Sequence, residues 1–230
     1  MNEQLPLGLQ LRASARFSSF VPGEQSELCR QLQFVVEGAV PGPLYVWGSS
    51  GTGKTHLLQA GCHQAHSLGR SAAYLSLRDW RQLSPEVFGG WESFDLACVD
   101  DIDAIAGHAE WEEALFHLYN RLQGAGNAFV VSATTAPAQL PIRLPDLVSR
   151  LAAGLVYQLH PLDDEQSLQA MRLRARQYGF ELPEETALYL LRRLPRDLPA
   201  LMALLECLDI ASLAAQRKLT VPFVKSVLKL

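Results

Sequence analysis

The feature that most constrains this chain is a glycine-rich segment that lies between a short apolar run and an amphipathic stretch. It reads Gly48-Ser49-Ser50-Gly51-Thr52-Gly53-Lys54-Thr55 and matches the pattern G-x-x-x-x-G-K-[ST] in full. Glycines let successive backbone N–H groups point at a phosphate, and a following helix adds the positive end of its dipole. The lysine reaches the β- and γ-phosphates, and the Thr55 hydroxyl ligates Mg²⁺. The segment, with His56 beside it, predicts a nucleotide site.

Apolar runs and helical patterns alternate over the first part of the chain. The runs that read as strands are Leu44–Trp47, Ala72–Leu75, Leu96–Val99, Phe129–Val131 and Leu155–Tyr157. Between them apolar residues recur at helical spacing, as they do from Trp111 to Leu122. Short, continuously apolar strands separated by helices are typical of a parallel sheet that is covered on both faces. The fold class predicted is therefore α/β.

The alternation stops after about Pro161, and the remainder reads as helices only. The predicted helices run from Glu165 to Tyr178, from Glu184 to Leu194, from Asp197 to about Ala214, and from Val221 to Leu228. A length of 230 residues allows one domain or two. We expect a tail over residues 1–15, an α/β nucleotide-binding domain over 16–160 and a small all-α domain over 161–230.

Composition excludes several classes of protein. The net charge of −4 argues against a protein whose main role is to coat nucleic acid or an acidic membrane. No apolar run approaches the ~20 residues that span a bilayer, and the N-terminus is a poor signal peptide. The four cysteines form no C-x-x-C pair, which favours a reduced compartment. We expect a cytoplasmic protein with no membrane partner.

Two acids follow the predicted strand Leu96–Val99. In a protein with a phosphate-binding loop, a carboxylate at the tip of this strand holds the Mg²⁺ shell, and a second acid polarises the attacking water. Asp100 is the candidate on the metal side, with Thr55, and Asp101 the candidate on the water side. The alternative is a solvated acidic turn that also includes Asp103.

These motifs resemble the AAA+ ATPases. Along the chain, a phosphate-binding loop is followed by a strand that ends in paired acids and by a polar residue after the next strand. An arginine follows the helix beyond it, and a helical lid comes last. Phe17–Gly23, Glu113–Asn120 and Leu147–Leu151 look like the ATPase core of the bacterial replication initiator DnaA. Gly179–Glu184 and Ala215–Lys225 are similar to the Hda family, stand-alone DnaA homologues that inactivate DnaA. The resemblance covers essentially the whole chain and implies an AAA+ sheet followed by a helical lid.

The resemblance also implies roles for individual residues. Arg150 matches the arginine finger, which reaches a nucleotide on a neighbouring subunit; without the resemblance it reads as a helix-end salt bridge. Arg196 matches the sensor 2 arginine of the lid. Thr134 falls at the sensor 1 position, where relatives of the initiator have an aspartate. Phe20 and Val21 lie in the loop that contacts the base.

The segment Gln4–Leu9 resembles the peptide by which the Hda family binds the sliding clamp, the beta subunit of DNA polymerase III. The candidate contacts are Gln4, Leu5, Leu7 and Leu9, and Gly8 departs from a bulkier pattern. An extended peptide of this kind inserts alternate apolar side chains into a groove. The alternative is an edge strand or a frayed tail, since the leucines alternate with period two.

The resemblance implies a negative regulator of DNA replication initiation that carries ADP or ATP with Mg²⁺. Its partners would be DnaA and the clamp, with DNA reached through them, and self-association is left open. With the clamp it would promote hydrolysis of ATP on DnaA, its own ATPase being weak. The alternatives are an autonomous DnaA-like ATPase or helicase loader, and a nucleotide-stabilised scaffold with no catalytic role.

Overall fold

The structure is a computed structural model that describes residues 11–39, 43–193, 198–215 and 218–228. Its contacts divide the chain into two compact units. The first contains the chain up to Phe17 and Glu24–Leu159, and the second contains Ser18–Gly23 and His160–Leu230. In the described part of the chain, no helix is both long enough and apolar enough to cross a membrane.

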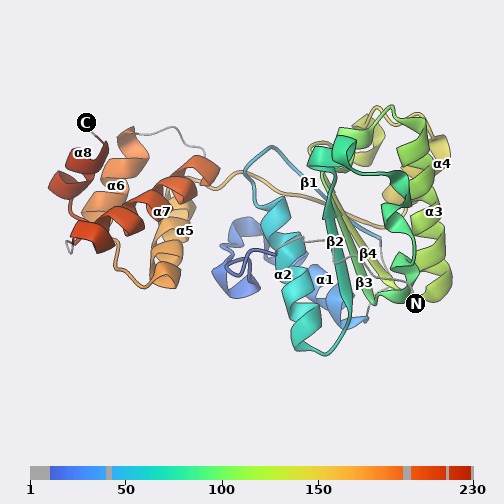
Figure 1. The fold of residues 1–230 in the computed structure, drawn as a ribbon, viewed down its shortest axis with the longest axis horizontal. Helices are drawn as coiled ribbons and strands as arrows, with labels where there is room; N and C mark the ends of the chain where they lie inside the picture. Colours follow the sequence, from blue (N-terminus) through green and yellow to red (C-terminus); the bar gives the residue numbers. More distant parts are fainter. Residues whose placement is uncertain (1–10, 40–42, 194–197, 216–217, 229–230) are drawn as a thin grey trace. The chain divides into compact units, whose positions relative to one another are not determined.

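The first unit is built on one parallel sheet with the strand order β2-β3-β4-β1-β5 (Figure 1). The strands are β1 (Leu44–Trp47), β2 (Ala72–Ser76), β3 (Leu96–Asp100), β4 (Ala128–Ala133) and β5 (Leu155–Gln158). Each contains a run predicted from the sequence, and the fold class is confirmed. In a parallel sheet the carboxyl ends of the strands share one edge, so the segments that follow β1, β3 and β4 meet there.

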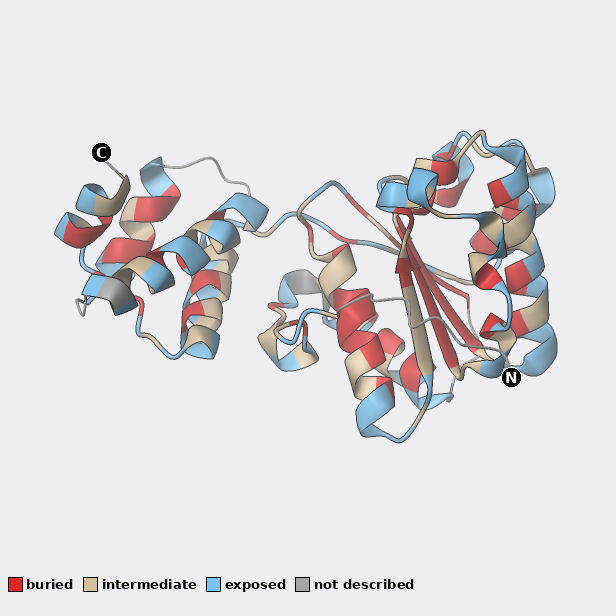
Figure 2. Cartoon of the chain, in the orientation of Figure 1, coloured by how far each residue is buried: buried red, intermediate tan, exposed pale blue. Residues whose placement is uncertain are grey.

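Helices cover both faces of this sheet (Figure 1). They are α1 (Ser26–Glu37), α2 (Lys54–Ser67), α3 (Ala109–Ala125) and α4 (Pro145–Ala152). Alternate strand residues point to opposite faces. Tyr45 and Val99 join the core that contains Leu118 and Leu147 of α3 and α4. Cys98, one residue before Val99, places its Sγ 3.8 Å from the Leu58 carbonyl oxygen of α2. Figure 2 shows the three central strands β3, β4 and β1 as mostly buried, whereas the edge strands β2 and β5 are more exposed.

In the residues that the structure describes, the second unit contains four α-helices packed on their own apolar core. They are α5 (Asp164–Tyr178), α6 (Glu184–Arg193), α7 (Leu198–Ala215) and α8 (Val221–Leu228). These bounds agree with the predicted helices to within about one residue. The side chain of Asp163 accepts from the Gln166 N–H, and Gln166 accepts from the Asp163 N–H, which forms a capping box at the start of α5. Residues 18–23 group with this unit, which the sequence pattern did not indicate.

The sequence prediction missed α1. Its buried residues Leu28, Leu32, Val35 and Val36 recur at i, i+4, i+7 and i+8, which is the spacing of one helix face. Gly38, in the left-handed conformation at φ 78°, ends the helix. The signal was therefore present in the sequence but was not used.

Candidate functional site

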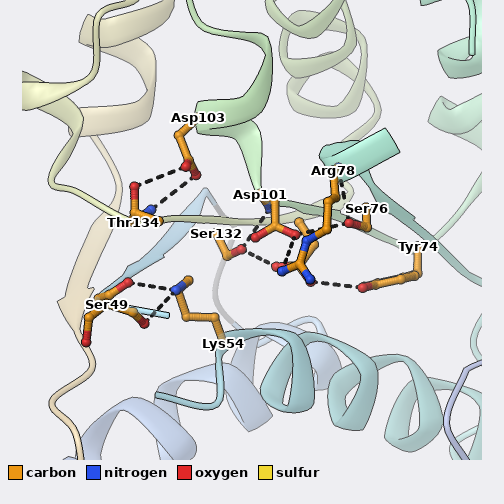
Figure 3. Close-up of polar contacts among 11 residues, drawn as sticks. Ser49, Lys54, Tyr74, Ser76, Arg78, Asp101, Asp103, Ser132 and Thr134 are labelled. Atoms are coloured by element: carbon orange, nitrogen blue, oxygen red, sulfur yellow. Dashed lines mark hydrogen bonds and ion pairs between the residues drawn. The ribbon is translucent and has the colours of Figure 1, made fainter. Parts of the chain in front are cut away.

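The glycine-rich loop joins the carboxyl end of β1 to the start of α2, at the carboxyl edge of the sheet (Figure 3). A Cβ added to Gly48 would lie 2.3 Å from the Leu159 carbonyl oxygen, so a side chain has no room there. Gly51 and Gly53 have φ of 81° and 103°, a region that disfavours residues with a Cβ. The glycines at these three positions are required by the backbone itself.

Lys54, the first residue of α2, turns back into this loop (Figure 3). Its Nζ donates to the carbonyl oxygens of Gly48 at 2.6 Å and Ser49 at 3.0 Å. The Thr52 hydroxyl donates to the same Ser49 carbonyl at 2.9 Å. Burial lowers the pKa of Lys54, and the charges of Asp101 and Asp100 oppose that change. The ammonium is thus held inside the loop by hydrogen bonds to carbonyl oxygens. It can exchange these for hydrogen bonds to phosphate oxygens.

Asp100 ends β3 and is completely buried. The Tyr74 hydroxyl of β2 donates to its Oδ2 at 2.9 Å, and the Ser132 hydroxyl of β4 donates to its Oδ1. The alternative of a solvated acidic turn is therefore wrong for Asp100. A buried carboxylate held from both neighbouring strands suits a fixed ligand position at the strand tip.

Asp101 follows in the left-handed conformation, with φ 58°, and points another way. Its Oδ2 accepts from the Ser76 hydroxyl at 3.1 Å and lies 3.4 Å from the Arg78 guanidinium (Figure 3). Its N–H donates to the Ser132 hydroxyl at 3.1 Å. Burial and then the charge of Asp100 raise the pKa of Asp101, while Arg78 and Ser76 lower it. Asp101 is thus a constrained, ion-paired carboxylate.

Thr134 directly follows β4 and is tied to Asp103. Its N–H and its hydroxyl donate to the two carboxylate oxygens of Asp103, at 3.1 and 3.0 Å. Asp103 lies in the segment that follows β3. Its pair with Thr134 therefore links the carboxyl ends of two neighbouring strands (Figure 3). The structure therefore places a carboxylate, supplied from another loop, beside the residue predicted as sensor 1.

The remaining predicted residues fall in several places. Thr55 is the second residue of α2, and Ser50 is exposed in the loop. The His56 Nε2 lies 2.9 Å from the Arg16 carbonyl oxygen. Phe20 and Val21 belong to the second unit. The predicted contacts that lie outside the described residues are Arg196, Gln4, Leu5, Leu7 and Leu9.

Sequence reasoning missed four polar side chains around the paired acids: Tyr74, Ser76, Arg78 and Ser132. The register places Ser76 directly opposite Asp100. Polar residues at the carboxyl ends of the flanking strands were the available signal, but the strand order needed to use it was not known from the sequence.

Arg150 lies in the last turn of α4 and is exposed. Its guanidinium carbon is 5.8 Å from the centre of the Tyr119 ring of α3. Among the described residues, no carboxylate forms an ion pair with Arg150. The interpretation as a helix-end salt bridge is therefore not supported within that part of the chain.

The residues present fit a nucleotide with Mg²⁺. The loop offers a glycine cradle and a buried ammonium, and Thr55 and Asp100 are oxygen donors of the kind that Mg²⁺ prefers. No group of three His, Cys, Asp or Glu side chains within the described ranges could hold a metal. Mg²⁺ at this site would therefore take further ligands from phosphate oxygens and water.

The strand order, the glycine-rich loop after β1 and the buried acid at the tip of β3, followed by a helical unit, define an AAA+ protein with a lid. The chain belongs to the family of the bacterial DnaA ATPase domain, whose model matches residues 11–82 and 86–158. Residues 164–228 match the model of the Hda lid domain. The chain is therefore an Hda-like AAA+ protein, as its resemblance implied.

Solved structures agree with this assignment. Domain III of the Thermotoga maritima replication initiation protein DnaA is 25% identical, with a TM-score of 0.79, over 96% of this chain and 98% of that one. AMPPCP-bound DnaA from Aquifex aeolicus is 25% identical, with a TM-score of 0.72, over 86% and 67%. The RuvB branch migration motor of Thermotoga maritima, at 17% identity and a TM-score of 0.66 over 89% and 68%, shares the fold.

The ion pair between Arg78 and Asp101 leads to a pH-dependent prediction. The pair exists only while Asp101 is ionised, so its stabilisation is present at pH 7 and is lost as the pH falls through the pKa of Asp101. Because the Arg78 side chain is 71% exposed, we expect Arg78→Ala to lower the free energy of unfolding by less than about 1 kcal/mol at pH 7. Because the pKa of Asp101 is raised from its ordinary value, the difference from the wild type should shrink towards zero by about pH 3.

Urea unfolding at the two pH values measures this effect. All four tryptophans, Trp47, Trp80, Trp91 and Trp111, lie in the first unit, so their fluorescence follows that unit alone. Arg81→Ala is the matched control, because Arg81 stacks on the Trp80 ring and its effect should not depend on pH over this range. An Arg78→Ala effect of equal size at both pH values would contradict the assignment of the pair.

Proposed function

We propose that this chain binds ADP or ATP with Mg²⁺ and promotes the hydrolysis of ATP bound to DnaA, which would make it a negative regulator of replication initiation. Arg150 carries the proposal: it is an exposed arginine at the end of a short helix, and no carboxylate of the described chain pairs with it. A guanidinium that reaches a transferred phosphoryl group stabilises the charge that builds there. The match to the Hda lid supports DnaA as the partner.

The residues of the chain's own site would hold its nucleotide. Lys54 would bind the β- and γ-phosphates, Thr55 and Asp100 the Mg²⁺, and Asp101 would face the water. The DnaA homologue from Aquifex aeolicus carries AMPPCP, which supports an adenine nucleotide here. Phe20 and Val21 would contact the base, Thr134 would sense the γ-phosphate through its pair with Asp103, and Arg196 would reach the phosphates from the lid.

The Arg78–Asp101 pair favours action on a partner over independent turnover. An acid that is already paired with a guanidinium is a poorer acceptor for the proton of an attacking water. The chain's own ATPase would therefore be slow, in contrast to an autonomous ATPase or helicase loader. Clamp binding through Gln4, Leu5, Leu7 and Leu9 would bring Arg150 to DnaA on DNA in the cytoplasm.

One assay tests this function. ATP turnover is measured for this chain, for DnaA with clamp and DNA, and for the mixture with and without clamp. We expect slow turnover alone, clamp-dependent stimulation in the mixture, and at least a ten-fold loss of the stimulated rate in Arg150→Ala. Arg30→Ala, at an exposed arginine of α1, should behave like the wild type. Stimulation that survives Arg150→Ala would reject the role of Arg150, and no stimulation at all would favour the scaffold.

A further inference from the structure

Glu112 is a buried acid on α3 that no proposed step uses. It is 1% exposed, and among the described residues its carboxylate accepts hydrogen bonds only from backbone N–H groups. Gly107 donates to Oε1 at 2.6 Å, Arg143 donates to both oxygens at 3.2 and 3.0 Å, and Leu144 donates to Oε2 at 3.0 Å. In the described part of the chain Glu112 forms no ion pair. A buried charge that is satisfied by three backbone donors fixes those donors in place.

Two of these donors define where α4 begins. Leu144 directly precedes the helix and has no side-chain hydrogen bond that caps it. The carboxylate of Glu112, from another helix, therefore fixes the entry of the chain into α4. Arg150 lies six residues beyond Leu144, about 9 Å along a helix that rises ~1.5 Å per residue. A tilt of α4 at its start would displace Arg150 at its end.

Tyr119 of α3 contacts Arg150 in the last turn of α4. It follows Glu112 by seven residues, two helical turns, so both residues lie on one face of α3. Its ring is buried against Phe129 of β4, with centroids 6.2 Å apart, and it presents its face to the Arg150 guanidinium at 5.8 Å. α3 thus contacts α4 at the backbone where α4 begins and at the arginine where it ends.

We infer that Glu112 is a positioning residue for Arg150, and that Tyr119 orients the guanidinium at the other end of α4. The inference rests on the proposed function of Arg150, since positioning matters only if Arg150 must reach a phosphoryl group. Holding a reacting group in place lowers the barrier of the reaction without tightening the initial encounter. Glu112 therefore acts on kcat and leaves docking of the partner unchanged.

Glu112→Gln tests this role because it keeps the size of the side chain. The amide replaces one acceptor oxygen by an NH₂ donor, so at least one of the three backbone N–H groups loses its partner. We expect the maximal stimulated rate of ATP hydrolysis on DnaA to fall about ten-fold, with the half-saturating concentration of this chain unchanged. Glu113→Gln, at the exposed neighbouring acid, is the matched control and should change neither quantity.

A double-mutant cycle separates positioning from general damage. If Glu112 acts through Arg150, Glu112→Gln will have no further effect in an Arg150→Ala background. If each substitution lowers the maximal stimulated rate independently, so that their fold-changes multiply, the inference is wrong. A change in the half-saturating concentration with an unchanged maximal rate would also overturn it. If Glu112→Gln fails to fold by circular dichroism, the same cycle is run with Tyr119→Leu, for which Tyr119→Phe is the control that keeps the ring.

An NMR measurement tests the positioning without DnaA. The Nε–H signal of Arg150, assigned by its loss in Arg150→Ala, should move in Glu112→Gln or Tyr119→Leu and stay in place in Glu113→Gln and Tyr119→Phe. An unmoved signal would overturn the inference even if Arg150 proves essential. A signal that moves, together with stimulation that survives Arg150→Ala, would reject the proposed function and leave the positioning intact.

Discussion

Lys54→Ala should weaken the binding of a fluorescent ADP by about 1000-fold, or ~4 kcal/mol, because it removes the ammonium that lies inside the loop. The Lys54 ammonium is already desolvated between the Gly48 and Ser49 carbonyl oxygens, at 2.6 and 3.0 Å. Exchange of these contacts for phosphate oxygens replaces neutral acceptors by anionic ones, so the ammonium gains the attraction of an opposite charge in a desolvated site. The loss should therefore be much larger than that for an exposed lysine.

Titration of the fluorescent nucleotide, with and without Mg²⁺, measures this loss. Lys225→Ala is the matched control: this lysine lies on α8 over the Tyr189 ring and should leave the affinity unchanged. Tryptophan fluorescence during urea unfolding shows whether the Lys54 variant remains folded. A folded Lys54→Ala protein with wild-type affinity would mean that the loop does not bind the phosphates.

The sequence predicted the sheet well because of how its strands are buried. β3 and β4 are covered on both faces, so nearly every residue in them is apolar and the runs are visible without an alignment. The glycine-rich loop was equally visible, because its glycines meet backbone constraints set within a few residues, as Gly51 and Gly53 show. Constraints of this kind depend on residues that are close in the sequence, so they can be predicted from the sequence alone.

The contacts among the acids could not be predicted in the same way. Arg78 reaches Asp101 from the segment after β2, and Thr134 reaches Asp103 from the segment after β4. Each pair joins residues that are far apart in the sequence and depends on which strands are neighbours. The backbone bonds of Glu112 are a further case, since nothing in the sequence distinguishes this buried acid from the exposed Glu113 beside it.

Gly48→Ala should lower the free energy of unfolding of the first unit by about 3 kcal/mol or more. The added Cβ would lie 2.3 Å from the Leu159 carbonyl oxygen and 3.1 Å from the Thr52 Oγ1. Leu159 cannot easily withdraw, because its N–H donates to the Trp47 carbonyl oxygen at 2.6 Å, directly after the paired ends of β1 and β5. Relief of the clash therefore requires either the glycine-rich loop or the paired ends of β1 and β5 to move.

Gly124→Ala is a control that should change stability in the opposite direction. Gly124 lies within α3, and apart from its chain neighbours and the backbone of its own helix, no atom of the described residues lies within 4 Å of the position its Cβ would take. Alanine there should raise the free energy of unfolding by about 0.5–1 kcal/mol, because it reduces the freedom of the unfolded chain. Urea unfolding followed by tryptophan fluorescence compares both variants on the same unit. Equal effects of the two substitutions would contradict a specific clash at Gly48.

Nucleotide binding then distinguishes a displaced loop from a displaced strand end. A ligand that binds only the folded state adds a stabilisation of RT ln(1 + [L]/Kd). If Gly48→Ala moves the loop, ADP should stabilise the variant much less than the wild type, because the backbone N–H groups no longer converge on the phosphate. If the end of β5 moves instead, stabilisation by ADP persists on a weakened fold. We expect the first result. Among the described residues of the loop, Gly48 is bonded to a strand, through its N–H to the Ala133 carbonyl oxygen at 3.3 Å, whereas β5 pairs with β1 along its length.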